Sequence, residues 1–136
     1  MILGQYKNAV LNQDVTVAAV NYRLGPWGFL QLNEVEDKQQ WRGHFGLQDQ
    51  VAGMKWMNAF GGIFGGDKDE ITIIGASAGS ESCWRHLTTP YAWPYFKRVA
   101  ATGIGLVAGS KADGRALKVF IKSIFMNTIY FFLFRN

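Results

Sequence analysis

The 136-residue chain has little of several residue types, and each scarcity narrows its class. It contains one cysteine, Cys83, so no disulfide can form within the chain. We expect Cys83 to be a small buried apolar residue, since cysteine is among the most frequently buried types. Charged residues make up only 18% of the chain and hydrophobic residues 49%, so we expect a packed core rather than a disordered chain.

The excess of positive charge is confined to one end of the chain. The formal net charge is +4, and residues 111–136 hold five Lys/Arg against a single Asp. Residues 1–110 are therefore balanced and give no electrostatic reason to expect a nucleic-acid partner. We assign residues 1–110 to one partial domain and residues 111–136 to a divergent, basic, apolar tail. For this tail we consider weak membrane association through a basic amphipathic helix over Leu117–Phe134, or a mis-joined C-terminus.

Targeting signals are also scarce. The first seven residues lack the basic region followed by an apolar core that is typical of a signal peptide, and no Asn-x-Ser/Thr site occurs. The sequence leaves the compartment and the oligomeric state open.

Apolar patterning indicates alternating strands and helices. Apolar, β-branched runs predict buried strands at 15–22, 71–74 and 98–103, and helical spacing predicts helices at 47–60 and 78–88. This order predicts an α/β fold: a three-layer sandwich with a mostly parallel sheet. The first helix has two apolar faces and is expected to be largely buried. One face holds Leu47, Val51 and Met54, and the other Ala52, Trp56 and Ala59.

The second strand leads into Gly75-Ala76-Ser77-Ala78-Gly79, which has the Gly-x-Ser-x-Gly pattern of a nucleophile elbow. Such a turn holds its serine at the tip of a sharp bend between strand and helix. The flanking glycines let the strand and the helix approach closely, and the start of the helix adds a positive dipole end. Ser77 is therefore the candidate nucleophile.

Two other segments are weaker candidates for a site. Residues 33–42 contain three acidic side chains, but no His or Cys accompanies them at ligand spacing, so a solvated loop is favoured over a metal site. Residues 61–66 are rich in glycine but follow a helix and precede a strand, which is the wrong order for a dinucleotide-binding loop.

Four segments together resemble one family, the type B carboxylesterases, which include the cholinesterases. They are NYRLGPWGFL at 21–30, GLQDQ at 46–50, FGGD at 64–67 and the elbow segment at 73–80. The similarity extends from about residue 12 to about residue 110, with the segments in the family's order and spacing.

The resemblance implies an α/β-hydrolase fold and hydrolysis of a small-molecule carboxylic ester through an acyl-enzyme. Ser77 matches the family nucleophile, and the backbone N–H of Ala78 matches one donor of the oxyanion hole. The resemblance implies neither a cofactor nor a metal.

The chain also departs from the family pattern. The family's histidine base and its acidic partner follow far downstream of the serine, and its HGGG segment precedes the first strand; none of these occurs here. Ala76 stands where the family has Glu. His86 would lie about 14 Å along the helix from Ser77 and is a poor base, and His44 is interpreted as a loop or helix-start residue.

We therefore expect the nucleophile-bearing piece of a carboxylesterase, truncated at both ends, with weak or no turnover. The alternative is a non-catalytic, cholinesterase-like remnant with an interaction role.

Overall fold

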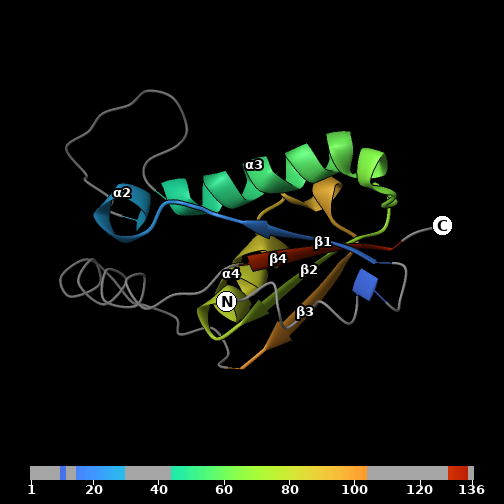
Figure 1. Ribbon diagram of the computed structural model, residues 1–136. Coiled ribbons are helices and arrows are strands. Elements are labelled where there is room, and N and C mark those ends of the chain that lie inside the picture. The colour runs from blue at the N-terminus through green and yellow to red at the C-terminus, as the bar shows by residue number, and fades with distance from the viewer. Residues whose placement is uncertain (1–9, 12–14, 30–43, 104–128, 135–136) are drawn as a thin grey trace.

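The computed structural model describes residues 10–11, 15–29, 44–103 and 129–134 (Figure 1). Each strand and helix predicted between residues 15 and 103 is confirmed, with ends shifted by at most two residues. In chain order the elements are β1 (Val15–Val20), α2 (Gly25–Phe29), α3 (Phe45–Phe60), a 3₁₀ turn (Gly61–Phe64), β2 (Ile71–Ala76), α4 (Ala78–Leu87), a second 3₁₀ turn (Trp93–Tyr95), β3 (Arg98–Thr102) and β4 (Ile129–Phe134).

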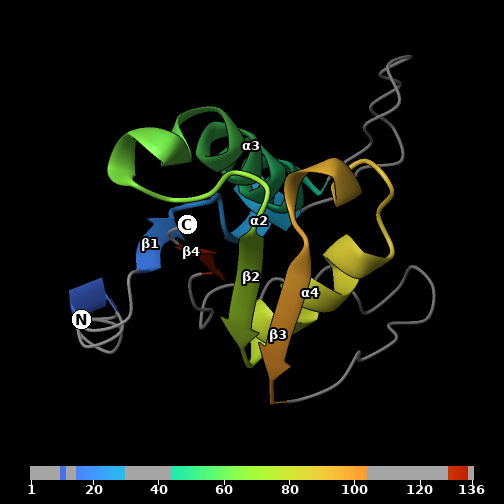
Figure 2. The ribbon, with the colours of Figure 1, turned by 90° about the vertical axis from the view of Figure 1, so that its right-hand side faces the viewer.

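The four strands form one sheet in the order β1-β4-β2-β3. β2 and β3 are parallel and lie side by side in Figure 2, whereas β4 is antiparallel to both of its neighbours. The strands β1, β2 and β3 therefore share one direction, and β4 alone runs the other way. An α/β fold with a mostly parallel sheet agrees with the sequence prediction.

β4 comes from the segment that the sequence analysis set apart as a tail. Phe131 pairs with Ala18 of β1 on one side and with Ile73 of β2 on the other. The amphipathic helix considered for Leu117–Phe134 is thus wrong for residues 129–134. The physical reason is that an extended, largely aromatic and β-branched segment satisfies the backbone groups of both neighbouring strands at once.

The rest of that tail, residues 111–128, lies outside the described residues, so weak membrane association stays a prediction. Among the helices that the structure describes, none is both long and apolar enough to cross a bilayer.

Both long helices cover the same face of the sheet. Gln50 of α3 hydrogen-bonds to Ser82 and His86 of α4, so the two helices are in direct contact. Ile71 and Ile73, which share one face of β2, pack in a single cluster with side chains from both helices. The sheet and this helical layer are two of the three predicted layers, and the third layer stays a prediction.

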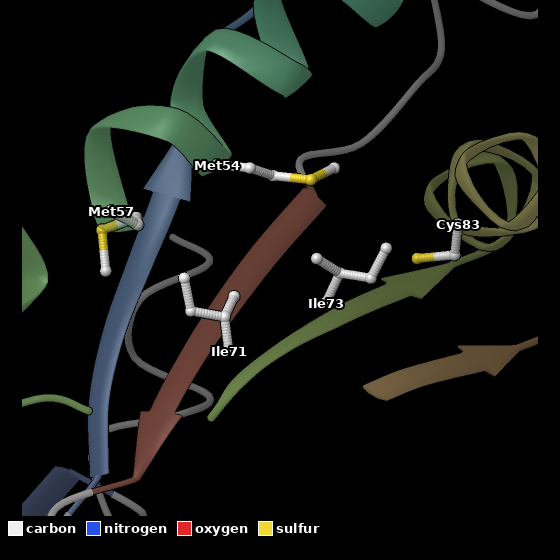
Figure 3. Close-up of a cluster of buried hydrophobic side chains, with 5 residues drawn as sticks. All are labelled: Met54, Met57, Ile71, Ile73 and Cys83. Atoms are coloured by element: carbon white, nitrogen blue, oxygen red, sulfur yellow. The ribbon is translucent and has the colours of Figure 1, made fainter. Parts of the chain in front are cut away.

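The core lies between β2 and the two helices. Met54 and Met57 from α3, Ile71 and Ile73 from β2, and Cys83 from α4 form a cluster in which no side chain is more than 2% exposed (Figure 3). Burial of a methionine or isoleucine of this kind contributes about 1.5–3 kcal/mol. The prediction that Cys83 is a buried apolar residue is confirmed, and burial raises the pKa of its thiol to about 12.

The helix α3 buries one face rather than two. Val51 and Met54 are buried as predicted, but Ala52, Trp56 and Ala59 are exposed. The prediction of a second buried face is wrong because, among the described residues, the sheet and α4 cover α3 from one side only.

An ion pair fixes the segment after β1 to α3. The guanidinium of Arg23 donates two hydrogen bonds to Asp49, of 2.7 Å and 2.6 Å, and the backbone N–H of Arg23 donates a third of 2.9 Å. These bonds to Arg23 hold the pKa of the Asp49 carboxyl below its usual range. The contact joins two of the family-like segments named above, 21–30 and 46–50.

Candidate active site

Ser77 is the single residue between the end of β2 and the start of α4, and it is exposed. Its backbone has φ 55° and ψ −117°. Among the described residues, His44 is the only other non-glycine residue with positive φ. Such a conformation costs about 1–3 kcal/mol and persists only where the surroundings enforce it. The turn is therefore sharp and strained, as the elbow pattern predicts.

Glycine at position 75 allows strand and helix to approach. A Cβ atom added to Gly75 would lie 2.1 Å from both the carbonyl carbon and oxygen of Gly79, and 2.7 Å from the amide nitrogen of Ser80. All three atoms belong to the backbone of α4 and cannot rotate away. The predicted reason for a glycine at 75 is confirmed, because only a residue without Cβ fits there.

Two backbone hydrogen bonds hold Ser77. Its N–H donates to the carbonyl oxygen of Thr102 at the end of β3, at 3.0 Å, and its carbonyl oxygen accepts from Glu81 N–H at 3.1 Å. Gly103, which follows Thr102 in the chain, has φ 105°. A Cβ atom placed on Gly103 would lie 3.2 Å from the backbone nitrogen of Ser77. Sequence reasoning missed this contact, although a glycine directly after a strand end was a visible signal.

The hydroxyl of Ser77 does not cap the helix that follows it. Because α4 begins at Ala78, the N–H of Ala78 has no partner within the helix, and the helix dipole adds partial positive charge at this end. An exposed hydroxyl thus stands beside N–H groups that can stabilise negative charge. Ala76, the last residue of β2, is also exposed and brings no carboxylate to this end of the strand.

His86 is turned away from the serine. It lies in the last turn of α4, is 1% exposed, and places Nε2 2.7 Å from Oε1 of Gln50. Burial lowers the pKa of its imidazole from 6.5 to about 4. Since Ser77 directly precedes the first residue of this ten-residue helix, roughly 14 Å separates Ser77 from His86 along the helix axis. The structure thus agrees that His86 is a poor base for Ser77.

His86 belongs to a buried polar network between α3 and α4 that the sequence did not reveal. Gln50 is fully buried. Its Oε1 accepts a hydrogen bond from Nε2–H of His86, and its Nε2 donates to Oγ of Ser82 at 3.2 Å. Tyr22 also hydrogen-bonds to Ser82 and Gln50, and its burial raises the pKa of its phenol. The helical spacing of polar residues at 82 and 86 on one face was the one available signal.

His44 is the N-terminal flanking residue of α3, as the interpretation of a helix-start residue predicted. Burial and then the charge of Arg85 lower the pKa of its imidazole. His44 is thus near the last turn of α4, the end remote from Ser77. Neither histidine of the chain is placed as a base for the serine.

No metal centre is found in the part of the chain that the structure describes, where no group of three or more His, Cys, Asp or Glu side chains could hold an ion. The acidic residues of 33–42 lie outside that part.

Comparisons with known proteins agree with the nucleophile-elbow geometry described above. A family model described as "Carboxylesterase family" matches residues 4–112. Acetylcholinesterase 1 of Caenorhabditis elegans is 39% identical over 98 residues, covering 71% of this chain and 15% of that protein. Carboxylesterase 1E of Mus musculus is 37% identical over 115 residues, covering 80% of this chain and 20% of that protein.

A solved structure of a PNB esterase superposes with a TM-score of 0.53 at 40% sequence identity, covering 58% of this chain and 16% of that chain. The chain thus spans a fifth or less of the length of these three relatives. The matched structure is an α/β-hydrolase esterase, and the strand, elbow and helix described above lie within the segment that the family model covers. By sequence and by fold, this chain is a partial member of the carboxylesterase family.

Proposed function

We propose that this chain carries the nucleophile-bearing part of a carboxylic ester hydrolase that acts on small-molecule esters, with Ser77 as the nucleophile. The observation that supports this most directly is the state of Ser77 between β2 and α4. Its backbone is strained, it is exposed, and its hydroxyl makes no capping hydrogen bond to α4. The relatives named above are called a carboxylesterase, an acetylcholinesterase and an esterase, which supports the same chemistry.

In the proposed reaction, Oγ of Ser77 attacks the ester carbonyl carbon while a base takes the hydroxyl proton. The carbonyl oxygen becomes an oxyanion and accepts a hydrogen bond from the N–H of Ala78. The bond to the alcohol oxygen then breaks, the alcohol leaves with a proton, and an acyl-serine remains. Water attacks this acyl group, releases the acid and restores the serine.

We expect the 136 residues on their own to turn over esters weakly or not at all. Both histidines lie at the far end of α4 from Ser77, so no imidazole stands ready to take the serine proton. A positioned serine without its base retains only what the oxyanion contacts and substrate binding supply. The alternative function, a non-catalytic member with an interaction role, predicts that Ser77 has no special reactivity.

Labelling with a fluorophosphonate probe separates the two. The serine oxygen displaces fluoride from phosphorus and forms a stable phosphonyl-serine, which mass spectrometry locates. We expect the full chain to be labelled at Ser77 at least about tenfold faster than Ser77→Ala is labelled anywhere, because the oxyanion contacts also stabilise the phosphonyl transition state.

The matched control is Ser80→Ala. It removes a hydroxyl that is fully buried and has no hydrogen-bond partner among the described residues, three positions from Ser77. Labelling of this variant should equal that of the unchanged chain. Labelling of the unchanged chain no faster than that of Ser77→Ala would refute a reactive Ser77 and favour the non-catalytic alternative.

A further inference from the structure

We propose that Gly103, together with the carbonyl of Thr102, is a positioning residue for Ser77: the end of β3 holds the backbone of the elbow in its strained conformation. This assignment goes beyond the Gly-x-Ser-x-Gly segment, since it depends on residues in the next strand. It rests on the proposed function only for the statement that the positioned serine is a nucleophile.

The first observation is a hydrogen bond beyond the end of the ladder. The last registered pair of β2 and β3 is Ala76 with Thr102. The N–H of Ser77 nevertheless donates to the Thr102 carbonyl at 3.0 Å, although Ser77 has already left strand geometry with φ 55°. The bond therefore fixes the serine at the point where its backbone turns.

The second observation is the space beside that bond. Gly103 has φ 105°, a region in which side chains other than hydrogen are strained. A Cβ atom there would also lie 3.2 Å from the nitrogen and 3.6 Å from the Cα of Ser77. The nearer contact is tighter than ordinary packing, and it is made with the same backbone atom that donates to Thr102.

The two observations combine at one atom, the amide nitrogen of Ser77. Any side chain at position 103 disfavours the positive φ of that residue. Its Cβ atom also crowds the amide nitrogen of Ser77, which donates the hydrogen bond to Thr102. Both effects move Ser77 relative to the N–H of Ala78. Displacements of about 1 Å at a reacting group can lower rates by a factor of 100.

The test compares the unchanged full chain with Gly103→Ala and with the control Gly62→Ala. An added Cβ at Gly62 meets nothing within 4 Å, so this second variant makes the same chemical change in open space. Two quantities are measured: the hydrogen exchange of the Ser77 amide by NMR, and the rate of fluorophosphonate labelling of Ser77.

In the unchanged chain we expect the Ser77 amide to be protected to the level of the β2 amides, such as that of Ile73. In Gly103→Ala we expect protection of Ser77 to fall at least about tenfold with Ile73 unchanged, and labelling to slow at least about tenfold. Gly62→Ala should match the unchanged chain in both measurements.

A D-alanine at position 103 provides a rescue. Its favoured φ is positive and its methyl group replaces the other Cα hydrogen, so it removes both objections to L-alanine. It can be introduced by ligating residues 1–82 to a synthetic peptide of residues 83–136, because Cys83 supplies the thiol for the junction. We expect Ser77 protection and labelling to return to at least half of the unchanged values.

Unchanged protection and labelling in Gly103→Ala would overturn the proposal. So would rapid exchange of the Ser77 amide in the unchanged chain, a result that does not require any variant to fold. If the unchanged chain is not labelled at all, the proposed function fails, but the exchange of the Ser77 amide still decides whether Gly103 positions it.

Discussion

At the scale of single residues, the elbow needs glycines that lack a Cβ atom as much as it needs a reactive serine. Gly75 faces the backbone of Gly79, and Gly103 faces the backbone of Ser77. In both places a side chain would meet main-chain atoms, which cannot move aside as a flexible side chain can. The strained backbone of Ser77 therefore depends on two glycines. One is Gly75 in the strand that leads to Ser77, and the other is Gly103, directly after the neighbouring strand.

The substitution Gly75→Ala should strongly destabilise the protein. Its Cβ would lie 2.1 Å from two backbone atoms of Gly79, so β2 and α4 must move apart. Overpacking of this kind costs about 3 kcal/mol, at the upper end of the usual range because the obstructing atoms are backbone. Urea denaturation of Gly75→Ala and of the open-space variant Gly62→Ala measures the difference. Equal denaturation midpoints for the two variants would contradict the expectation.

The sequence identified Ser77 and Gly75 because their spacing is local and fixed by the turn itself. Gly103 and Gln50 were missed because their partners lie far along the chain, at Ser77 and His86 respectively. The sequence signals at these sites, a glycine after a strand end and polar residues at helical spacing, do not say which distant residue is the partner. The close approach of a strand end to a turn is decided by how the elements assemble.

At the scale of elements, the chain between residues 15 and 102 follows its local pattern closely. β1, α3, β2, α4 and β3 begin and end near the predicted positions because apolar runs and helical periods are local properties. β4 was not foreseen as a strand. Its segment is apolar throughout, a composition that suits a buried strand or a helix equally, and its assignment depends on the unpaired edges of β1 and β2.

The effect of proline at position 131 tests the central place of β4. Phe131 is registered with Ala18 on one side and Ile73 on the other, so proline there removes a ladder donor in the middle of the sheet. We expect a loss of about 1–3 kcal/mol in the free energy of unfolding from the unpaired acceptor alone. Far-UV circular dichroism during heating would show a lower midpoint.

The matched variant is Phe131→Val, which also removes the aromatic ring but keeps the N–H and a high strand propensity. The proline variant should unfold at a clearly lower temperature than the valine variant. If both unfold at the same temperature, residue 131 does not lie in a paired central strand.

At the scale of the whole molecule, buried polar side chains lie between the two helices of the helical layer. Gln50, Ser82 and His86 join α3 to α4 by hydrogen bonds while being at most 7% exposed. Buried polar groups of this kind are costly when one partner is removed or becomes charged. The stability of the fold should therefore depend on the protonation of the buried imidazole.

Acid should weaken the fold through His86. Burial lowers the pKa of His86 from 6.5 to about 4, so between these pH values the unfolded chain binds a proton that the folded chain does not. The free energy of unfolding should thus fall as the pH drops from about 6.5 to about 4, by about 3 kcal/mol from this group.

His86→Gln supplies the comparison, since its neutral amide can still donate to Gln50. Its free energy of unfolding, obtained from urea denaturation at pH 7 and pH 4, should fall by about 3 kcal/mol less than that of the unchanged chain. Acidic groups such as Asp49 contribute equally to both proteins and cancel in the difference. A pH dependence that is the same in the two proteins would show that His86 is not buried in its neutral form.

The position of β4 in the sheet also has a consequence for biosynthesis. β4 is synthesised after β1, β2 and β3, yet it is the strand that joins β1 to β2. The two edges on either side of it stay open throughout translation of the intervening chain, and open edges pair readily with other polypeptides. Ribosomes that pause before codon 129 should therefore leave nascent chains dependent on chaperones, and the release of residues 129–134 should end that dependence.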